Sequence, residues 1–327
     1  MTPFADLLSN WGLTFSRLRP DLAIPGSPER CLFRNVVEDS SASLWLLEQL
    51  GPGQTMRREA LGQLLDALAE RGLCGLAPYR GVHASSGPEA SIRADTGPFV
   101  MKDWGRSWQL SPFILGEPLV QPDYLGDSAK GGSLGAWIAA LREASIGLPV
   151  PDGLFPLDLP AYVTDLLARI GRARPDVHTR ASRLVPALTE FFEAYAQLPR
   201  ALCHGDMHPL NVIWGASGGP PFLAVIDWEF AGVRPALYDL ANCLGCTGIE
   251  GDGGFDSPFA LGLLSRAQAE GLLPDDQCRW LSPMIRATRF GWLSEWLRRK
   301  DEEMIGLELT YMEHLSRLPE GNALPGA

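Results

Sequence analysis

Two segments that each carry an aspartate flank a predicted β-hairpin, and this arrangement constrains the fold more than any other feature of the sequence. The first segment reads Cys203-His204-Gly205-Asp206-Met207-His208-Pro209-Leu210-Asn211, and the second reads Ile226-Asp227-Trp228-Glu229. Two strand-like runs, 211–214 and 222–226, are joined by a stretch rich in Gly and Pro, which is typical of a hairpin. Because antiparallel pairing brings the start of one strand beside the end of the other, Asn211 and Asp227 are predicted to be neighbours.

The polar residues of these segments are those that phosphoryl transfer needs. Magnesium prefers hard oxygen ligands and keeps several waters, so one carboxylate and one amide oxygen suit it when nucleotide phosphates complete the shell. Asp227 and Asn211 would supply those oxygens. Asp206 precedes Asn211 by five positions, which is the spacing of the protein-kinase loop whose aspartate accepts the substrate hydroxyl proton. The pattern predicts a magnesium-nucleotide phosphotransfer site.

The two motifs together, in this order and across a hairpin, resemble the aminoglycoside phosphotransferase and choline kinase-like family. Relatives of that family include homoserine, fructosamine and methylthioribose kinases. Residues 235–241 are similar to the family's following segment, and close motif identity is confined to about residues 201–242. The resemblance implies an ATP-dependent, magnesium-dependent kinase that transfers the γ-phosphate to a hydroxyl of a small metabolite or an aminoglycoside-like acceptor.

The resemblance also implies roles for single residues. Asp206 would be the catalytic base, and Asn211 and Asp227 would hold magnesium. The supporting residues of the loop would be His204, His208 and Asp239. A different use of the two histidines stays open, because His204 and His208 could instead be zinc ligands of a metallohydrolase, although Pro209 disfavours a helix that would place both on one face.

The length of the chain and its pattern of apolar residues predict an α+β fold of two unequal lobes, and the family resemblance implies that this fold is of the protein-kinase kind. A chain of 327 residues exceeds what one hydrophobic core usually supports. Residues 1–115 are predicted to form a nucleotide-binding antiparallel sheet with one helix at 55–71, after a helical or irregular lead-in at 1–20. Residues 116–327 are predicted to form a larger, mainly helical lobe. Its expected helices are 131–145, 159–171, 179–198, 236–246, 257–270, 276–298 and 300–317.

The small lobe departs from the family pattern where a basic residue usually contacts the phosphates. The third predicted strand, 44–50, carries Glu48 at that position. One interpretation is a swapped pair, in which Glu48 faces Arg57 or Arg58 on the following helix and an arginine reaches the phosphates. Alternatively, Glu48 contacts magnesium or a polar group of the nucleotide, catalysis is weak or lost, or the predicted strand register is wrong. The expected phosphate loop, 24–30, contains a single glycine.

The remaining binding surfaces are predicted from apolar segments. Residues 108–116 should form the interlobe strand and hinge, with Phe113 and Leu115 near the adenine. The aromatic and acidic segment 290–303 could form a wall for a cationic or amino-bearing acceptor. Trp292 and Trp296, four residues apart, are equally compatible with the core of a helix.

The composition narrows the classes of partner. A net charge of −11 disfavours nucleic acid and anionic membranes as partners. Neither a signal peptide nor a long apolar span is evident, so a cytoplasmic location is expected. Cys243 and Cys246 form a CxxC pair, which suggests either a metal or redox site or two small apolar helix residues. The alternative to an active kinase is a catalytically weak or inactive kinase-like protein that binds a nucleotide or another ligand.

Overall fold

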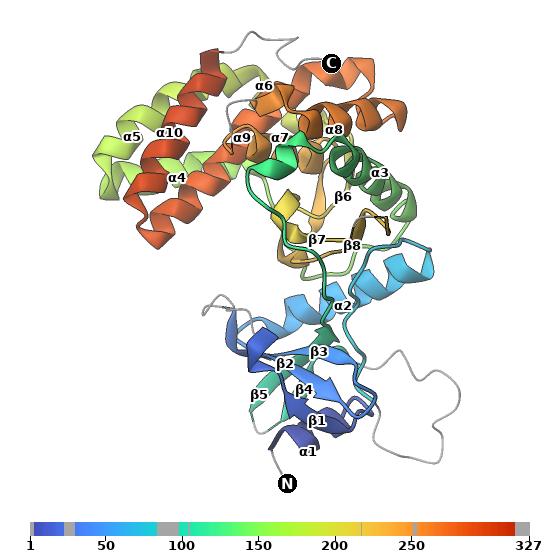
Figure 1. The fold of residues 1–327 in the computed structure, drawn as a ribbon. Coiled ribbons are helices and arrows are strands. Elements are labelled where there is room, and N and C mark those ends of the chain that lie inside the picture. Colours follow the sequence, from blue (N-terminus) through green and yellow to red (C-terminus); the bar gives the residue numbers. More distant parts are fainter. Residues whose placement is uncertain are drawn as a thin grey trace.

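The chain folds into two lobes of unequal size, and the sheet-bearing small lobe lies at the bottom of Figure 1. The computed structural model describes residues 3–22, 30–83, 98–103, 105–216, 218–250 and 254–317. The small lobe contains a five-stranded antiparallel sheet in the order β1-β2-β3-β5-β4. These strands are β1 (Phe15–Leu18), β2 (Cys31–Asp39), β3 (Leu44–Leu50), β4 (Met101–Asp103) and β5 (Arg106–Pro112). The predicted α+β, two-lobed fold is confirmed.

The β2–β3 hairpin fixes the register of the small lobe. The Asp39 carboxylate accepts hydrogen bonds from the backbone N–H groups of Ser41 (2.8 Å) and Ser43 (3.0 Å), which closes the turn between the two strands. From this turn the antiparallel register pairs Arg34 of β2 with Glu48 of β3. Neighbouring residues in such a pair present their side chains on the same face of the sheet. The hairpin therefore places Arg34 beside Glu48, the glutamate found where the family usually has a basic residue.

Helix α2 (Thr55–Glu70) follows the β3 strand of the small lobe and packs against the large lobe. Its leucines recur at three- and four-residue spacing and are buried together. They are Leu61, Leu64, Leu65 and Leu68, and they belong to the same apolar cluster as Trp137 and Trp228 of the large lobe. The sheet has a separate cluster around Trp11, Leu47 and Leu110. In Figure 1, α2 lies between the sheet and the hairpin formed by β7 and β8. Burial of this leucine face in the large lobe fixes where α2 presents its polar residues.

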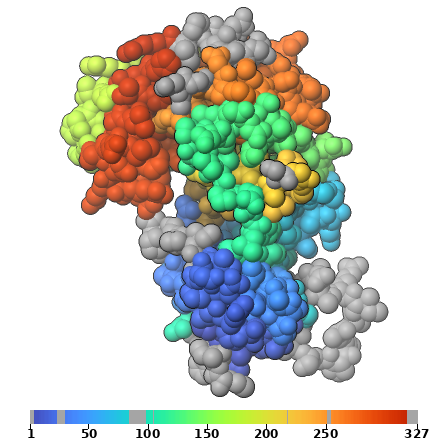
Figure 2. Space-filling view, viewed as in Figure 1, coloured from blue at the N-terminus to red at the C-terminus, as the bar shows by residue number. Residues whose placement is uncertain are grey.

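The large lobe combines helices with two short hairpins. Strand β6 (Arg200–Cys203) pairs with β9 (Gly232–Pro235), and β7 (Val212–Trp214) pairs with β8 (Phe222–Val225). The register of β7 and β8 joins Val212 to Val225, as the predicted hairpin requires. The helices are α3 (Ser128–Ala144), α4 (Leu159–Ala173), α5 (Pro175–Ala181), α6 (Thr189–Ala194), α7 (Tyr238–Thr247), α8 (Pro258–Ala269), α9 (Asp275–Arg299) and α10 (Glu302–Arg317). Figure 2 shows that the green segment after β5 joins the two lobes.

Three predictions about local structure were wrong or incomplete. The single helix predicted at 179–198 is instead a series of short helices that includes a 3₁₀ segment, Ser182–Leu188. Pro186 lies inside that segment and has no N–H to continue a helix. The lead-in contains helix α1 (Pro3–Ser9) and the edge strand β1. Strand β6, rather than a helix, precedes the first aspartate motif.

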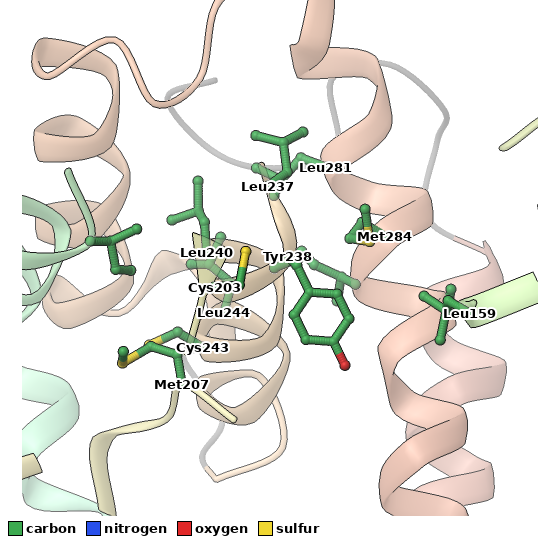
Figure 3. Packing of buried hydrophobic residues seen from close by; sticks show 14 of the residues in the cluster. Leu159, Cys203, Met207, Leu237, Tyr238, Leu240, Cys243, Leu244, Leu281 and Met284 are labelled. Atoms are coloured by element: carbon green, nitrogen blue, oxygen red, sulfur yellow. The ribbon is translucent and has the colours of Figure 1, made fainter. Parts of the chain in front are cut away.

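The core of the large lobe lies directly behind the two aspartate motifs. Figure 3 shows Cys203 and Met207 from the loop region packed with Leu240, Cys243 and Leu244 of α7. Cys243 and Cys246 are buried, free thiols, and burial raises the pKa of both. They therefore serve as small apolar residues of the core. None of the described helices is long and apolar enough to cross a membrane.

Candidate active site

The loop between β6 and β7 is held by Asp239 at the start of α7. Its carboxylate accepts hydrogen bonds from the backbone N–H groups of His204 (2.7 Å) and Gly205 (2.9 Å). Gly205 has a φ of +83°, and a Cβ at this position would overlap the carbonyl oxygen of Phe230. Only glycine tolerates both conditions. Burial raises the pKa of Asp239 to about 6, against the opposing effect of the two backbone N–H groups.

His204 joins the first aspartate motif to the second. Its Nε2 lies 2.9 Å from the carbonyl oxygen of Ile226, and its Nδ1 accepts the backbone N–H of Asp206 at 3.3 Å. The ring is fully buried, and this desolvation lowers the pKa of His204 to about 4. The neutral ring therefore donates from Nε2 and accepts at Nδ1. With both nitrogens engaged, His204 is not available as a zinc ligand.

Asp206 and Asn211 contact each other within the loop. The Asn211 Nδ2 donates to the backbone oxygen of Asp206 at 2.9 Å and to its Oδ2 at 3.1 Å. His208 Nε2 lies 3.7 Å from the same Oδ2. Burial alone would raise the pKa of Asp206, but His208, His204 and Asn211 together hold it below its ordinary value. The carboxylate is therefore ionised at neutral pH and can accept a proton.

Asp227 follows β8 in an unusual backbone conformation. Its φ of 63° and ψ of 57° lie in the left-handed region, which is uncommon for non-glycine residues, although Asp adopts it more often than most. The backbone N–H of Ile226 donates to the backbone carbonyl oxygen of Asn211 at 2.9 Å. This bond joins the two motifs beside Asp227. Desolvation, together with the charges of Glu229 and Asp206, raises the pKa of Asp227 to about 6. Water reaches this carboxylate in the cleft and limits the free energy that the shift represents.

The oxygen atoms of Asn211 and Asp227 suit magnesium, which shares its coordination shell with water and phosphate. They suit less well a metal whose ligands all come from the protein. Asn211 uses its Nδ2 toward Asp206, so its Oδ1 remains for a cation. Asp227 lies close to two further carboxylates, and a cation would relieve that repulsion. Within the described ranges, no three His, Cys, Asp or Glu side chains converge on a possible metal position. Two protein oxygens completed by phosphate and water are typical of magnesium.

A network of charged residues connects the small lobe to the second motif. Arg58 of α2 donates to Glu229 Oε1 from Nη2 at 2.8 Å, and its Nη1 lies 3.9 Å from Glu48 Oε2. Arg34 Nε lies 3.4 Å from Glu48 Oε1, and Arg30 Nη1 lies 2.5 Å from Glu229 Oε2. The predicted swapped pair thus has Arg58 on the helix and not Arg57. The Arg57 guanidinium lies over the Phe155 ring, 5.2 Å from its centroid.

A cavity of about 660 Å³ lies between the lobes. The hinge contributes Ser111, Phe113 and Ile114, and the phosphate side contributes Arg30, Arg34 and Arg58. Leu115, predicted to lie near the adenine, is 60% exposed and is outside this lining. Its place is taken by Ile114, because side chains alternate in an extended segment. The predicted phosphate loop falls largely on residues 24–29, outside the described residues, and only its Arg30 is described.

A second cavity of about 500 Å³ opens on the other side of the aspartate motifs. Asp206, Asn211 and Asp227 form its inner side, and the Trp292 and Trp296 side chains of α9 form part of its wall. Of the acidic residues in the predicted segment 290–303, Glu295 lines this cavity. Glu295 binds Arg298 at 2.7 Å and Arg299 at 2.6 Å, so its charge is compensated.

The comparison with protein families agrees with this geometry. The model of the phosphotransferase enzyme family matches residues 55–273, which covers more than half of the chain and both aspartate motifs. The chain belongs to the phosphotransferase enzyme family.

Two curated members of similar sequence are homoserine kinases. The one from Gluconacetobacter diazotrophicus is 29% identical over 163 residues, 48% of this chain and 49% of that protein. The one from Methylocella silvestris is 30% identical over 195 residues, 59% of this chain and 54% of that protein. The matches thus span about half the length of these relatives.

Solved structures of phosphotransferases share the fold. An amicoumacin kinase in complex with AMP-PNP, Ca²⁺ and Ami has a TM-score of 0.66 at 14% identity, with 98% of this chain and 94% of that chain covered. The macrolide 2′-phosphotransferase MphH from Brachybacterium faecium has a TM-score of 0.60 at 17% identity, with 98% and 100% covered. At such low identity the likeness establishes the fold and not the substrate.

Two residues of this phosphotransferase site were not predicted from the sequence. Glu229 was noted only as the end of a motif, yet it binds both Arg30 and Arg58. Arg234 lines the second cavity but resembles any surface arginine in the sequence. The pairing of β9 with β6, which joins Arg234 to Ala201, brings it to the catalytic loop. A strand predicted at 200–203 would have indicated that Arg234 lies near the loop that contains Asp206.

Proposed function

We propose that this phosphotransferase is a magnesium-dependent kinase that transfers the γ-phosphate of ATP to a hydroxyl of a small metabolite. The observation that carries the proposal is the meeting of Asp206, Asn211 and Asp227 between two cavities. The interlobe cavity has a size and an apolar hinge that suit a nucleotide, and the second cavity suits a small acceptor. ATP is proposed over GTP because the family resemblance implies it.

The proposed reaction uses few protein groups. The acceptor hydroxyl is oriented by the ionised Asp206 carboxylate, which accepts its proton as the oxygen forms a bond to the γ-phosphorus. The bond from that phosphorus to the bridging oxygen breaks, and ADP leaves. Asn211 Oδ1 and the Asp227 carboxylate would hold magnesium, which neutralises phosphate charge when bound. Arg30, Arg34 and Arg58 supply positive charge where the family uses one basic strand residue.

Homoserine is the first acceptor to test, because the two curated relatives carry that activity in their names. The match covers only about half of each relative, so a panel of hydroxyl compounds that includes choline, sugars and aminoglycosides belongs in the same experiment. A substrate is identified by release of ADP above the rate without acceptor.

The decisive variant is Asp206→Asn, which keeps the size of the side chain and removes the base. We expect the rate with the best acceptor to fall by about 100- to 10,000-fold while nucleotide affinity changes little. Asp165→Asn, an exposed aspartate of α4, is the matched control. Unchanged turnover in Asp206→Asn would refute the assignment of the base.

A second candidate function is a kinase-like protein that binds nucleotide without turnover. The observation that favours it is Glu48, whose buried carboxylate lies where the family usually has a basic residue. Nucleotide binding without ADP release across the whole acceptor panel would support this alternative over the kinase.

A further inference from the structure

Arg234 is a buried arginine without a carboxylate partner among the described residues. It is 1% exposed, and its Nη2 donates to the backbone carbonyl of Phe230. Its Nε and Nη1 have no hydrogen-bond partner. A buried cation is costly unless it is paired. The position thus has a strong positive charge that the protein itself does not neutralise through an ion pair.

Burial raises the pKa of Asp239 and the charge of Arg234 acts to lower it, but the two side chains form no ion pair. Both oxygens of Asp239 accept backbone N–H groups, one from His204 and one from Gly205. The guanidinium of Arg234 is instead held between aromatic rings, with its Cζ 4.7 Å from the centroid of Tyr238 and 5.7 Å from that of Phe155. Such rings fix the plane of a guanidinium, and the Nε and Nη1 atoms of Arg234 stay buried and without a hydrogen-bond partner.

Arg234 lies at the acceptor side of the catalytic loop. It lines the cavity that contains Asp206 and Trp292. A Cβ built on Gly205, the residue before the catalytic aspartate, would come within 2.8 Å of Arg234 Nη2. Tyr238, whose ring faces the guanidinium, lines the same cavity. Figure 3 shows the phenol oxygen of Tyr238 directed away from the apolar cluster formed by Leu237 and Leu281.

The other charged residues that line this cavity already have assigned partners. Arg30 is paired with Glu229, and the two C-terminal arginines of α9 are paired with Glu295. Asp206 contacts Asn211 and His208. Asp227 is the proposed magnesium ligand. Arg234 is therefore a cation of this lining for which no ion pair is found among the described residues, and it lies in the same cavity as the ionised Asp206.

We propose that Arg234 binds a carboxylate of the acceptor, which makes the acceptor a small hydroxy acid or hydroxy amino acid. This inference rests on the proposed function of the same cavity. A carboxylate can accept two parallel N–H groups from a guanidinium, and this geometry orients the acceptor as well as holding it. A polycationic aminoglycoside would meet an uncompensated positive charge at this position and is disfavoured as acceptor.

The test compares L-homoserine with two acceptors that each lack one of its charged groups, the amine in 4-hydroxybutyrate and the carboxylate in 3-amino-1-propanol. L-Homoserine, 4-hydroxybutyrate and 3-amino-1-propanol share a primary hydroxyl, and the last lacks the carboxylate. Binding of each compound to the full chain with ADP and magnesium is measured by calorimetry, beside kcat/KM with ATP. We expect the two carboxylates to bind and react about 100-fold or more better than the amino alcohol.

The variant Arg234→Met removes the charge and keeps an apolar stem. It should lower this preference to less than about tenfold, because binding of the two carboxylate compounds weakens and binding of the amino alcohol does not. Arg234→Lys keeps the charge without the planar fork and should give an intermediate preference even if the Met variant folds poorly. Arg200→Met, on the paired strand β6 and exposed, is the matched control and should keep the full preference.

Different failures have different meanings. If the wild-type protein binds the amino alcohol as well as the carboxylates, or if Arg234→Met weakens all three equally, the inference about Arg234 is overturned. If carboxylates bind selectively through Arg234 but no phosphate is transferred, the proposed function fails while this inference is supported.

Discussion

At the scale of single residues, the two aspartate motifs are joined by polar side chains that hydrogen-bond to backbone groups. Asp239 holds the N–H groups of His204 and Gly205, and His204 links Asp206 to Ile226. These bonds fix the backbone of both motifs before any ligand binds. In the proposed reaction Asp206 and Asn211 would therefore need little reorganisation, which is how positioned groups contribute most.

The buried ring of His204 gives the loop a pH-dependent stability. Its folded-state pKa of about 4 lies below the ordinary value near 6.5, so the unfolded chain binds the proton first as pH falls. The folding free energy that the neutral ring contributes is fully present above about pH 6.5 and is lost as the pH falls toward 4. We expect His204→Gln to be less stable than the wild type at about pH 7.5, and the difference to shrink by about 2 kcal/mol at pH 5.

Urea unfolding at the two pH values measures that difference directly. Comparison with the variant removes the opposite contribution of Asp239, whose raised pKa favours the folded state as pH falls. His314→Gln, an exposed histidine of α10, is the control. A stability difference that stays constant between the two pH values would contradict the neutral, buried state of His204.

At the scale of elements, α2 determines how the small lobe reaches the catalytic centre. Its leucine face is buried in the cluster of the large lobe, while Arg58 extends from the same helix to Glu229 and Glu48. The helix thus positions one cation between a carboxylate of each lobe. This arrangement takes the place of the basic strand residue and acidic helix residue usual in the family.

Removal of that cation should destabilise the folded protein strongly. Arg58→Met leaves Glu48 and Glu229 buried without their shared partner, and breaking a buried pair in this way costs about 3–5 kcal/mol. Arg57→Met, on the same helix but over the Phe155 ring, should cost less than about 1 kcal/mol. Equal losses in the two variants, measured by chemical denaturation, would show that Arg58 has no special role.

The contrast between these elements shows what the sequence could predict. The β7–β8 hairpin and the leucine face of α2 depend on residues close in sequence, so alternation, spacing and turn residues were sufficient. Arg58 and Glu229 are 171 positions apart, and neither carries a signal that it faces the other. The choice between Arg57 and Arg58 also depended on one residue of helical rotation, about 100°, which pattern alone did not fix.

At the scale of the whole molecule, the two cavities meet at the catalytic centre. Arg30, Asn211 and Asp227 line both of them. The proposed nucleotide cavity lies between the lobes, and the proposed acceptor cavity is lined by the large lobe together with Arg30 of the small lobe. Under the proposed function, a nucleotide and an acceptor are bound together, with the γ-phosphate and the hydroxyl in contact beside these shared residues. Direct transfer in such a complex requires no phosphorylated protein intermediate.

This geometry predicts sequential kinetics. Initial rates measured at several fixed acceptor concentrations, with ATP varied, should give intersecting lines in double-reciprocal plots, because both substrates must be present before phosphate moves. Protein incubated with γ-labelled ATP and magnesium alone should retain no covalent label, and Asp206→Asn should behave in the same way. Parallel lines together with stable labelling of the chain would indicate a covalent intermediate. Direct transfer between adjoining cavities would then be wrong, even if the acceptor specificity were as proposed.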